Sequence, residues 1–524
     1  MTLPSDSHPR RSSALVYWLV FALLVAWRLP HLRGPLTDPH SWRACDTVHT
    51  ALDFYRRGFD LMHPRVCWLG AHRTLLLNFP LSETMSALLY RAFGPDPMWD
   101  RVVSLFFGIV ATLYAGATAR VLAGGRAGRL TALAYLAIPL SQYFSRVPHI
   151  EFSVIALVNG TFYHALRAHE EDSLKHAVLG ALCGIGAGLV KGPYLATLGL
   201  PLLAVLLHAP TPRRTLYAVA PFLAAMAAFF IWREHVDKIN ATVPDWNFLP
   251  DFYKEVNPLW RYTGTLQERL ELANWIKIAH RLVYELASPV GCVFAVLALA
   301  RAGGDRARPA VAGRTALDAR WIAVLWYVNC LVHVLVFFRL NAWHNYYQMP
   351  FIAPSALLIG FGADWAWDRM PRWGGVPSAA LAFALFLGVA LWVPHRVGYD
   401  RVDWLRTEAG PLISAQVPKD DLVVTADYNT LPPTDPRLLF RADRDGWPMR
   451  ANEITADRLA KLRPYGVRWV VVLTNPENPE CVPPAFLEPA RTATVPVMHE
   501  GKRLGTLHVF QLSRLWAGTT GASR

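Results

Sequence analysis

The sequence predicts an α-helical polytopic membrane protein with a small α/β domain at its C-terminal end. Three observations lead to this prediction: 53% of the 524 residues are hydrophobic, only 17% are charged, and the apolar residues gather in long runs. A helix that crosses a bilayer needs about 20 mostly apolar residues, and about 17 is the short end of the range. So apolar a composition excludes a single soluble domain and indicates a membrane bundle with a soluble appendage.

Eleven runs meet this length, and they lie near residues 12–29, 98–122, 128–144, 147–167, 176–190, 192–208, 216–232, 282–300, 321–338, 346–362 and 376–393. No small-residue cleavage site follows the first run, so we interpret it as a retained anchor. The apolar stretch at 81–93 is too short to cross. Its apolar residues share one helical face, so we predict an amphipathic helix on the membrane surface, through Leu81, Met85, Leu88, Leu89 and Ala92.

Basic residues orient the predicted helices. One alternate set of connections contains Arg10, Arg11, Arg120, Arg126, Arg129, Arg167, Lys175, Arg213, Arg214, Arg301, Arg306, Arg308, Arg314, Arg320, Arg369 and Arg372. The opposite short connections contain Arg146, Lys191 and Arg339. This bias holds only if 81–93 does not cross, and it predicts a cytoplasmic N-terminus and an outer C-terminus. The net charge of +13 is then a topology signal, and no nucleic-acid partner is expected.

Three long segments face outward on this topology: 30–97, 233–281 and the tail. We predict two domains, a membrane module at 1–393 and an outer α/β domain at 394–524. In the tail, alternating and turn residues predict strands at 421–427 and 468–473, a helix over 454–466, and a hairpin turning at Gly501. The segment 301–314 is expected to be a flexible inner connection. Cys45 and Cys67 share the first outer loop, and whether they pair is left open.

Ionisable residues gather where the predicted helices meet the outer side. Such residues near membrane depth are expensive to place and point to function. The first loop reads HSWRACDTVHT, the later segments read SRVPHIEF, VKGPY and HNYYQMP, and the candidates are His40, Arg43, Asp46, His49, Glu83, Arg101, Arg146, His149, Glu151, Lys191, His344, Tyr346 and Tyr347.

The ordered series HSWRACDT, FPLSETMSALLYRAFG, WDRVVSLFFG, QYFSRVPHIE, LVKGP and HNYYQMP resembles the GT-C glycosyltransferases. The bacterial branch related to protein O-mannosyltransferases and to the lipid A aminoarabinose transferase is the most similar. Family members usually read His-Ser-Trp-Arg-Gln-Ala-Asp-Thr in the first loop, and here Ala44 and Cys45 replace Gln and Ala. The resemblance implies a multi-pass protein of the bacterial inner membrane, with a polyprenyl-phosphate sugar as donor on the outer face.

Sugar transfer from such a donor requires a base for the acceptor proton and a cationic site for the leaving phosphate. Asp46 is the predicted base, in a single displacement that inverts the anomeric carbon of a hexosyl or pentosyl group. The competing interpretation is that Asp46 only caps the helix TVHTALDFY. The predicted phosphate ligands are, in order of preference, Arg101, Arg146, Lys191 and His344.

The remaining polar residues are expected to serve the acceptor or to assist. Glu151 resembles a second acidic position of the family, and it would bind acceptor or a divalent ion. Sequence spacing cannot test a divalent metal site, and no other cofactor is expected. The auxiliary candidates are His40, Arg43, His49, Glu83, His149, Glu151, Tyr346 and Tyr347. The acceptor is a glycolipid, a glycan or a protein.

Two other functions compete with this prediction. A polytopic transporter would use repeated halves, broken helices and polar residues at mid-span, whereas here no repeat is found and the polar residues lie at one face. A lipid-linked polysaccharide polymerase or ligase would share the helix count. Its key loops would be rich in Arg and His without the early Asp46.

Overall fold

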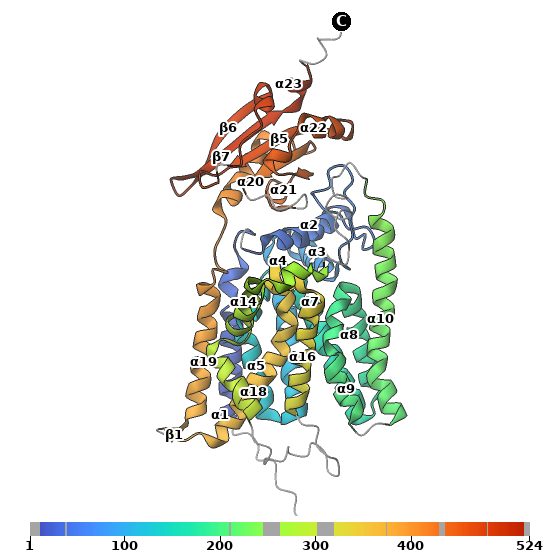
Figure 1. The fold of residues 1–524 in the computed structure, drawn as a ribbon, viewed down its shortest axis with the longest axis vertical. Helices are drawn as coiled ribbons and strands as arrows, with labels where there is room; N and C mark the ends of the chain where they lie inside the picture. The colour runs from blue at the N-terminus through green and yellow to red at the C-terminus, as the bar shows by residue number, and fades with distance from the viewer. Residues whose placement is uncertain are drawn as a thin grey trace, which may run out of the picture. The chain divides into compact units, whose positions relative to one another are not determined.

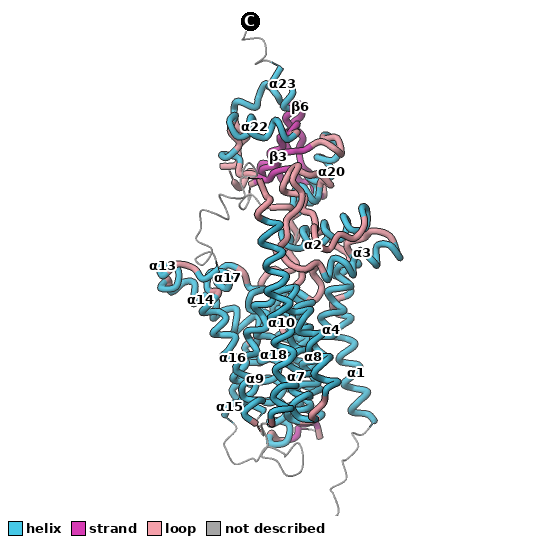
Figure 2. The backbone as a smooth tube through the Cα atoms, turned by 90° about the vertical axis from the view of Figure 1, so that its right-hand side faces the viewer, coloured by secondary structure: helices cyan, strands magenta, loops and turns pink. Residues whose placement is uncertain are grey.

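The structure, a computed structural model, describes residues 11–36, 39–208, 211–244, 262–300, 319–373, 375–428, 435–478 and 480–517. The chain forms two compact units, each discontinuous in sequence (Figures 1 and 2). The first unit comprises Met1–Arg33, Arg101–Phe230 and Tyr262–Val397, and the second Gly34–Asp100, Ile231–Arg261 and Gly398–Arg524. The segments 301–314 and 245–261 lie outside the described residues. The two-domain division at residue 393 stays a prediction.

The first unit is a helix bundle. Its helices are α1 (Arg11–Ala26), α4 (Met98–Ala123), α5 (Gly125–Ala137), α6 (Pro139–Phe144), α7 (Glu151–Glu171), α8 (Leu174–Lys191), α9 (Gly199–Leu207), α10 (Pro212–Asn240), α13 (Leu266–Leu270), α14 (Leu272–Arg281), α15 (Pro289–Ala300), α16 (Ala319–Val336), α17 (Phe338–Trp343), α18 (Ile352–Arg369) and α19 (Ser378–Arg396). Shorter helical turns are η1 (Leu29–Leu32), η2 (Gly192–Leu198), η4 (Leu282–Ala287) and η5 (Asn345–Phe351). A small hairpin of β1 (Arg372–Trp373) and β2 (Val376–Pro377) precedes α19.

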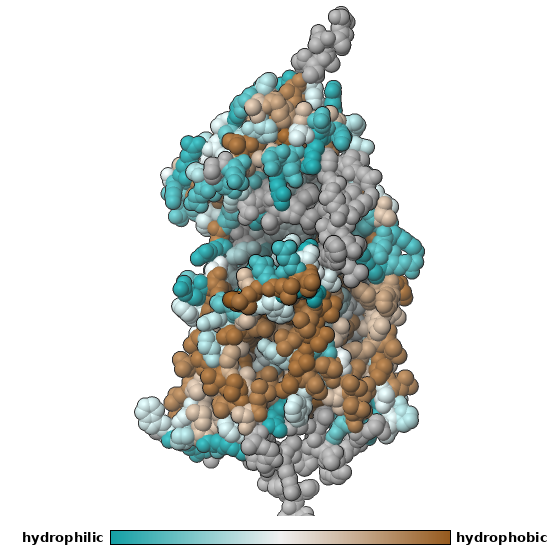
Figure 3. All heavy atoms as spheres, in the orientation of Figure 1, coloured by the Kyte–Doolittle hydropathy of each residue, from teal (hydrophilic) through white to brown (hydrophobic). Residues whose placement is uncertain are grey.

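The bundle has the surface of a multi-pass membrane protein. Among the described residues, seven helical stretches are long and apolar enough to cross a membrane, or eight if one bent pair is a single span. Hydrophobic side chains cover much of the bundle face shown in Figure 3. The predicted spans near 128–144 and 147–167 fall outside this set. The first is divided at Ile138, whose backbone leaves the helix (φ −52°, ψ 126°) before Pro139.

Glycines bring α8 and α10 into close contact. A Cβ added at Gly184 would lie 2.5 Å from the carbonyl oxygen of Pro221, and one at Gly188 would lie 2.3 Å from that of Ala225. Only residues without side chains allow so close a backbone approach between helices. Because the contacts advance in the same direction along both helices, α8 and α10 are parallel.

The chain reverses at Lys191, between α8 and α9. Gly180 of α8 packs beside His164 of α7, and Leu202 of α9 packs with Ala165 of α7. Residues 180 and 202 therefore lie at the same level of α7. Lys191 itself leaves the helical conformation, with φ −161° and ψ 73°. The continuous apolar stretch Leu174–Leu207 is thus two antiparallel helices, which supports separate predicted spans at 176–190 and 192–208. The total of eleven crossings stays a prediction.

The run predicted as a span near 282–300 is bent rather than straight. Helix α14 with η4 turns by 86° at Ser288 before α15 begins. Ser288 has a positive φ of 58°, which is uncommon for a residue other than glycine. Helix α15 packs on α18, because added Cβ atoms at Gly291 and Gly362 would meet Ile359 and Phe294 respectively. Only the part from Pro289 onward can run along the bundle.

In the second unit, α2 (Ser41–Arg57) packs against α3 (Leu81–Phe93). Helix α3 has 13 residues and is not among the candidate spans. Its buried face contains Ser82, Glu83, Ser86, Ala87 and Tyr90. None of the residues predicted to face the membrane is buried, and Leu88 is 53% exposed. This arrangement is compatible with the predicted surface helix.

The tail forms a five-stranded mixed sheet in the order β4-β3-β5-β7-β6. The strands are β3 (Leu422–Asp427), β4 (Gly446–Pro448), β5 (Val467–Thr474), β6 (Arg491–His499) and β7 (Lys502–Gln511), and β3 is parallel to β4 and β5. The helices are α20 (Trp404–Gln416), α21 (Arg437–Arg441), α22 (Ala456–Leu462) and α23 (Leu512–Ala517), with turns η6 (Ala451–Glu453), η7 (Arg463–Tyr465) and η8 (Ala485–Ala490). The predicted α/β tail is confirmed, including the hairpin at Gly501 (φ 79°).

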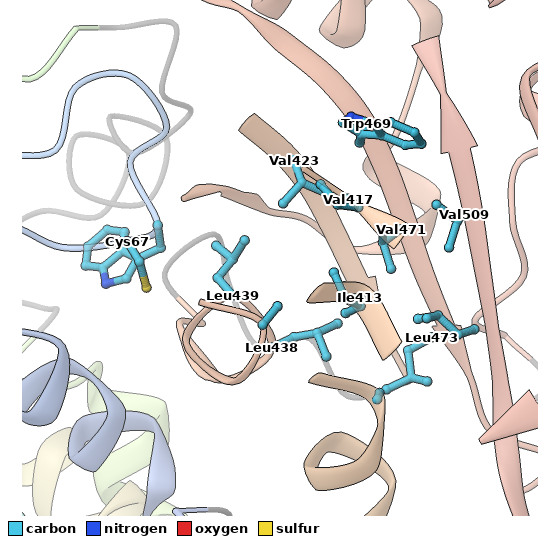
Figure 4. Close-up of a cluster of buried hydrophobic side chains, with 14 of the residues drawn as sticks. Cys67, Ile413, Val417, Val423, Leu438, Leu439, Trp469, Val471, Leu473 and Val509 are labelled. Carbon is cyan, nitrogen blue, oxygen red and sulfur yellow. The ribbon is translucent and has the colours of Figure 1, made fainter. Parts of the chain in front are cut away.

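Alternate strand residues build two cores, one on each face of the sheet. Val423 and Val471 face the core formed with α20 and α21, whereas Val424 and Val470 face the core that includes residues of α22. The first core also contains Val66, Cys67, Trp68, Leu69 and Leu75 from the first loop, of which Figure 4 labels Cys67. The loop and the tail therefore share one hydrophobic core.

Gly70 lets the loop dock on the sheet. Gly70 donates a backbone hydrogen bond of 2.8 Å to Gly446 of β4, and Gly446 donates one of 2.9 Å to Cys67. Gly70 has φ +55°, and a Cβ there would lie 1.9 Å from the ring of Trp447. Cys45 and Cys67 are both buried free thiols.

Candidate active site

Asp46 lies inside α2 rather than at its start. The helix begins at Ser41, and the residue before it, His40, makes no side-chain capping bond. Asp46 therefore stands more than one turn into the helix, where no free backbone N–H needs a cap. The capping interpretation of Asp46 does not fit this structure.

One oxygen of Asp46 is held and the other is not. The indole nitrogen of Trp68 donates a 2.8 Å hydrogen bond to Oδ1. Within the described part of the chain, Oδ2 has no hydrogen-bond partner, although the Arg43 guanidinium lies 3.7 Å away. The side chain is 4% exposed. Burial raises the pKa of Asp46 to about 7, despite the opposing charge of Arg43 and the hydrogen bond from Trp68.

Arg43 connects Asp46 to Glu83 through an amide. Arg43 donates a short hydrogen bond to the side-chain oxygen of Asn78. Glu83 is buried in α3 beside Asn78 and Arg43, and burial raises its pKa. Because the negative charge of Glu83 also raises the pKa of Asp46, the two carboxyl groups belong to one electrostatic network.

The tail adds a charge to this network. Asp435, which precedes α21, contributes to the raised pKa of Asp46. Asp435 is buried and pairs with Arg437 at 2.5 Å. Pro436 accepts a weak hydrogen bond from Cys67, with 4.0 Å between sulfur and oxygen. The second unit thus surrounds Asp46 with residues from the first loop, α3 and the tail.

Two histidines of the first loop, His40 and His49, flank Asp46 in the sequence. His49 is half-buried, and its pKa is lowered to about 4, by desolvation first and then by Arg56. It is therefore neutral at pH 7. The ring of His40 lies 6.2 Å from that of Tyr399.

A second cluster lies in the first unit, where α7 and α8 meet. Lys191 Nζ is 2.6 Å from Glu151 Oε1 and donates to the Tyr194 hydroxyl at 3.0 Å. It also lies 4.1 Å from the ring centre of Tyr347. Tyr194 in turn donates to the carbonyl oxygen of Tyr346 at 3.1 Å. The reversal of the chain at Lys191 thus presents its ammonium to one carboxylate, one hydroxyl and an aromatic face.

Histidine rings extend this cluster. The ring of His149 is tilted by 51° to that of Tyr346, with 4.9 Å between the ring centres, and its Nδ1 lies 4.0 Å from Glu151 Oε1. His344 stacks on Tyr346 at 4.9 Å. Burial first, then Arg281 and Lys191, lowers the pKa of His344 to about 4. His344 is neutral at pH 7, so it can donate a hydrogen bond but does not supply the positive charge that the sequence analysis assigned to it.

The two preferred arginines are buried in the same unit. Arg101 donates to the carbonyl oxygen of His31, and the Arg146 guanidinium lies 5.9 Å from the ring centre of Tyr143. Of the four predicted phosphate ligands, the structure joins Lys191 and His344 in one cluster with Tyr346 and Tyr347.

Sequence reasoning missed several partners. Trp68, Asn78 and Asp435 were not singled out, because their relation to Asp46 comes from loop and tail packing. Tyr194 belongs to the quoted VKGPY segment, so its place beside Lys191 was within reach of the sequence. Across the described residues, no group of three or more His, Cys, Asp or Glu side chains could hold a metal ion. Glu83 belongs to the second unit, whereas His149, Glu151 and His344 belong to the first.

Comparisons with known proteins agree with this architecture. A family described as dolichyl-phosphate-mannose-protein mannosyltransferase matches residues 80–235. No curated protein matches in sequence. The structure is similar to ArnT from Cupriavidus metallidurans bound to undecaprenyl phosphate, with TM-score 0.61 and 15% identity, covering 96% of this chain and 98% of ArnT. The same protein in the apo state gives TM-score 0.58 and 15% identity, over 95% and 98% of the two chains.

A more distant similarity is to the archaeal oligosaccharyltransferase AglB from Archaeoglobus fulgidus, solved with an inhibitory peptide and a dolichol-phosphate. It has TM-score 0.50 and 11% identity, over 88% of this chain and 70% of AglB. The chain therefore has the GT-C fold, and the predicted resemblance is confirmed. The match of residues 80–235 to this family model and the apolar spans are compatible with the predicted class, a multi-pass membrane glycosyltransferase.

Proposed function

We propose that the chain is an inverting glycosyltransferase that moves a sugar from a polyprenyl-phosphate donor to an acceptor hydroxyl. The observation that carries this proposal is the buried Asp46, held by Trp68 at one oxygen and without a hydrogen-bond partner at the other among the described residues. A general base works best when its pKa lies near the working pH. A carboxyl group with a pKa of about 7 meets that requirement.

The reaction needs one base and one phosphate site. Oδ2 of Asp46 takes the proton of the acceptor hydroxyl while the hydroxyl oxygen attacks the anomeric carbon. The bond from this carbon to the phosphate oxygen breaks, and its electron pair leaves with the phosphate. Because phosphate is a good leaving group, no general acid is required. A single displacement inverts the anomeric configuration.

The Lys191 cluster is the proposed phosphate site. The phosphate gains a second negative charge when it leaves, and a positioned cation stabilises that charge. Lys191 supplies the cation, while Tyr194 and neutral His344 can donate hydrogen bonds. Arg101 and Arg146 remain further proposed ligands. Glu151 holds Lys191 in place and competes with the phosphate for this lysine. The phosphate would compete more strongly once it changes from a monoanion to a dianion.

We further propose that the protein lies in the bacterial inner membrane with its N-terminus in the cytoplasm and its tail outside. Transfer on that side would require a lipid-linked donor, because no pool of nucleotide sugars is available there. Mass spectrometry of envelope glycolipids and glycoproteins from a deletion strain would identify the acceptor.

The direct test uses purified protein in nanodiscs with a set of polyprenyl-phosphate sugars and envelope extracts as acceptors. The proposal predicts sugar transfer with the anomeric configuration of the donor inverted, as read by NMR. A product with retained configuration would contradict the single displacement. No transfer from any such donor, with a correctly folded protein, would contradict the donor class.

A further inference from the structure

Three short helical segments before α15 have one face packed on the bundle and one apolar face exposed. On α14 and η4, Ile278 and Glu285 are buried, whereas Ile276 is 60% exposed. The large hydrophobic side chains exposed on this layer are Leu266, Leu270, Leu272, Ile276, Val283 and Tyr284. We call α13, α14 and η4, residues 266–287, the platform.

The direction of the platform matches a membrane surface. The stretch Leu272–Ala287 is bent by 86° from α15, which packs among the candidate spans through Gly291 and Ile359. A helix perpendicular to a crossing helix lies parallel to the bilayer plane. The apolar exposure continues onto α15 at Val293 and Val296, so the platform and the lipid-facing side of α15 are adjoining surfaces. An exposed apolar face in this place is suited to lipid acyl chains, with Lys277 near the headgroups.

The packed face holds the segment that leads to His344. Arg281 donates to the carbonyl oxygens of Asn341 at 2.9 Å, Ala342 at 3.3 Å and Trp343 at 3.4 Å. These are the last carbonyls of α17, which have no partner inside the helix. One guanidinium therefore fixes the end of α17 immediately before His344.

Three further contacts join the platform to the same segment. Glu285 accepts a 2.8 Å hydrogen bond from Asn345, on the other side of His344. Glu268 pairs with Arg339 at 2.9 Å, and the rings of Trp275 and Phe338 lie 4.9 Å apart. The turn that contains His344, Tyr346 and Tyr347 is thus held by the platform from both sides.

We propose that the platform rests on the bilayer surface and that Arg281 is a positioning residue, which places the 341–347 turn for the Lys191 cluster. Contact of Ile276 with acyl chains fixes the depth of α14 in the bilayer. Through its hydrogen bonds to the end of α17, Arg281 then fixes the position of His344. The proposal rests on the proposed function only in assigning the Lys191 cluster to the lipid-phosphate donor. Two of its three experiments need no sugar transfer and no phosphate binding, so its failure and that of the proposed function can be told apart.

The first experiment measures depth. Ile276→Cys carries an environment-sensitive fluorophore in nanodiscs that contain nitroxide-labelled phospholipid, and Gln267→Cys on the polar side of α13 is the matched control. We expect strong quenching at 276 and at least threefold less at 267. Equal quenching at the two sites would overturn the membrane placement.

The second experiment measures coupling by hydrogen exchange of the 341–347 peptide in nanodiscs. Arg281→Ala and Ile276→Asp should each accelerate exchange about tenfold, whereas Lys277→Ala, which removes a neighbouring exposed cation on the same helix, should not.

The third experiment uses undecaprenyl phosphate as the probe. Arg281→Ala should weaken its binding about tenfold, and Arg281→Lys should have an intermediate effect. The positioning role would be overturned if Arg281→Ala equalled Lys277→Ala in hydrogen exchange of the 341–347 peptide or in undecaprenyl phosphate binding.

Discussion

The indole nitrogen of Trp68 donates to Oδ1 of Asp46 over 2.8 Å, and both side chains are buried. The two residues come from different parts of the first loop, and Trp68 also lies in the hydrophobic core shared with the tail. A rigid core residue therefore fixes the orientation of the proposed base. The hydrogen bond leaves Oδ2 to accept a proton. It also lowers the pKa of the carboxyl group, whereas burial raises that pKa.

Replacing Trp68 by Phe should separate this orientation from core packing. Trp68→Phe retains most of the ring but removes the donor, so we expect kcat to fall about tenfold and the apparent pKa of the base to rise. The matched control is Trp469→Phe, which also removes an indole hydrogen bond to a carboxylate, that of Asp421 at 2.9 Å. The same loss of kcat in both variants would show that packing, not the Asp46 bond, is responsible.

The pKa of Asp46 predicts opposite pH effects on activity and stability. Below pH 7, kcat/KM should fall about tenfold per pH unit, because the protonated carboxyl cannot act as base. The folded pKa of about 7 exceeds the ordinary value of 3.8. The folded chain therefore holds a proton that the unfolded chain loses, and stability falls as pH rises from about 4 to about 7. Asp46→Asn should raise Tm at pH 8 by roughly a few degrees. An unchanged Tm and a flat pH–rate profile would contradict the raised pKa.

The Lys191–Glu151 pair distinguishes a phosphate ligand from a purely structural ion pair. Lys191→Gln should weaken undecaprenyl phosphate binding about 10- to 100-fold, since charge-assisted contacts contribute about 1.5–3 kcal/mol. Glu151→Gln removes the competing carboxylate at 2.6 Å, so binding should be unchanged or tighter. Equal losses in both single variants, recovered in the double variant, would indicate that the pair only stabilises the fold. Isothermal titration in nanodiscs measures both.

The predicted topology can be tested by thiol labelling in intact cells. Pro95→Cys, after α3, should react with an impermeant maleimide, whereas Ala123→Cys, at the end of α4, should react only after permeabilisation. Both positions are exposed, so accessibility within the protein does not separate them. Labelling of residue 123 alone in intact cells would invert the proposed orientation.

The fold could be predicted well where the local sequence carries the signal. The tail strands alternate between two cores, and glycines at 466 and 501 supply the positive φ values that end a helix and turn a hairpin. Strand β4 was missed because it has three residues, including a glycine and a proline, and contains no alternation. The bend at Ser288 was missed because its apolar run reads as one continuous helix.

Candidate residues for the site could be named from the sequence, but their arrangement could not. Asp46, Lys191, Glu151 and Tyr346 were each identified from the sequence. Their partners depend on packing between distant segments: Glu151 meets Lys191 because α7 and α8 are antiparallel, 40 residues apart in the chain. The neutral state of His344 could not be predicted from the sequence either, because it follows from burial in the fold.

Sugar transfer by Asp46→Asn in nanodiscs, under saturating donor, tests the central claim most directly. Asparagine preserves the shape and the hydrogen bond from Trp68, but it cannot accept a proton. We predict a 10²- to 10⁴-fold loss of kcat, about 3–5 kcal/mol, with undecaprenyl phosphate binding unchanged. Asp53→Asn on the same helix, which loses the ion pair to Arg57, should retain activity. Transfer by Asp46→Asn within threefold of wild type would contradict the account and assign the base to another carboxylate, Glu151 or Glu83.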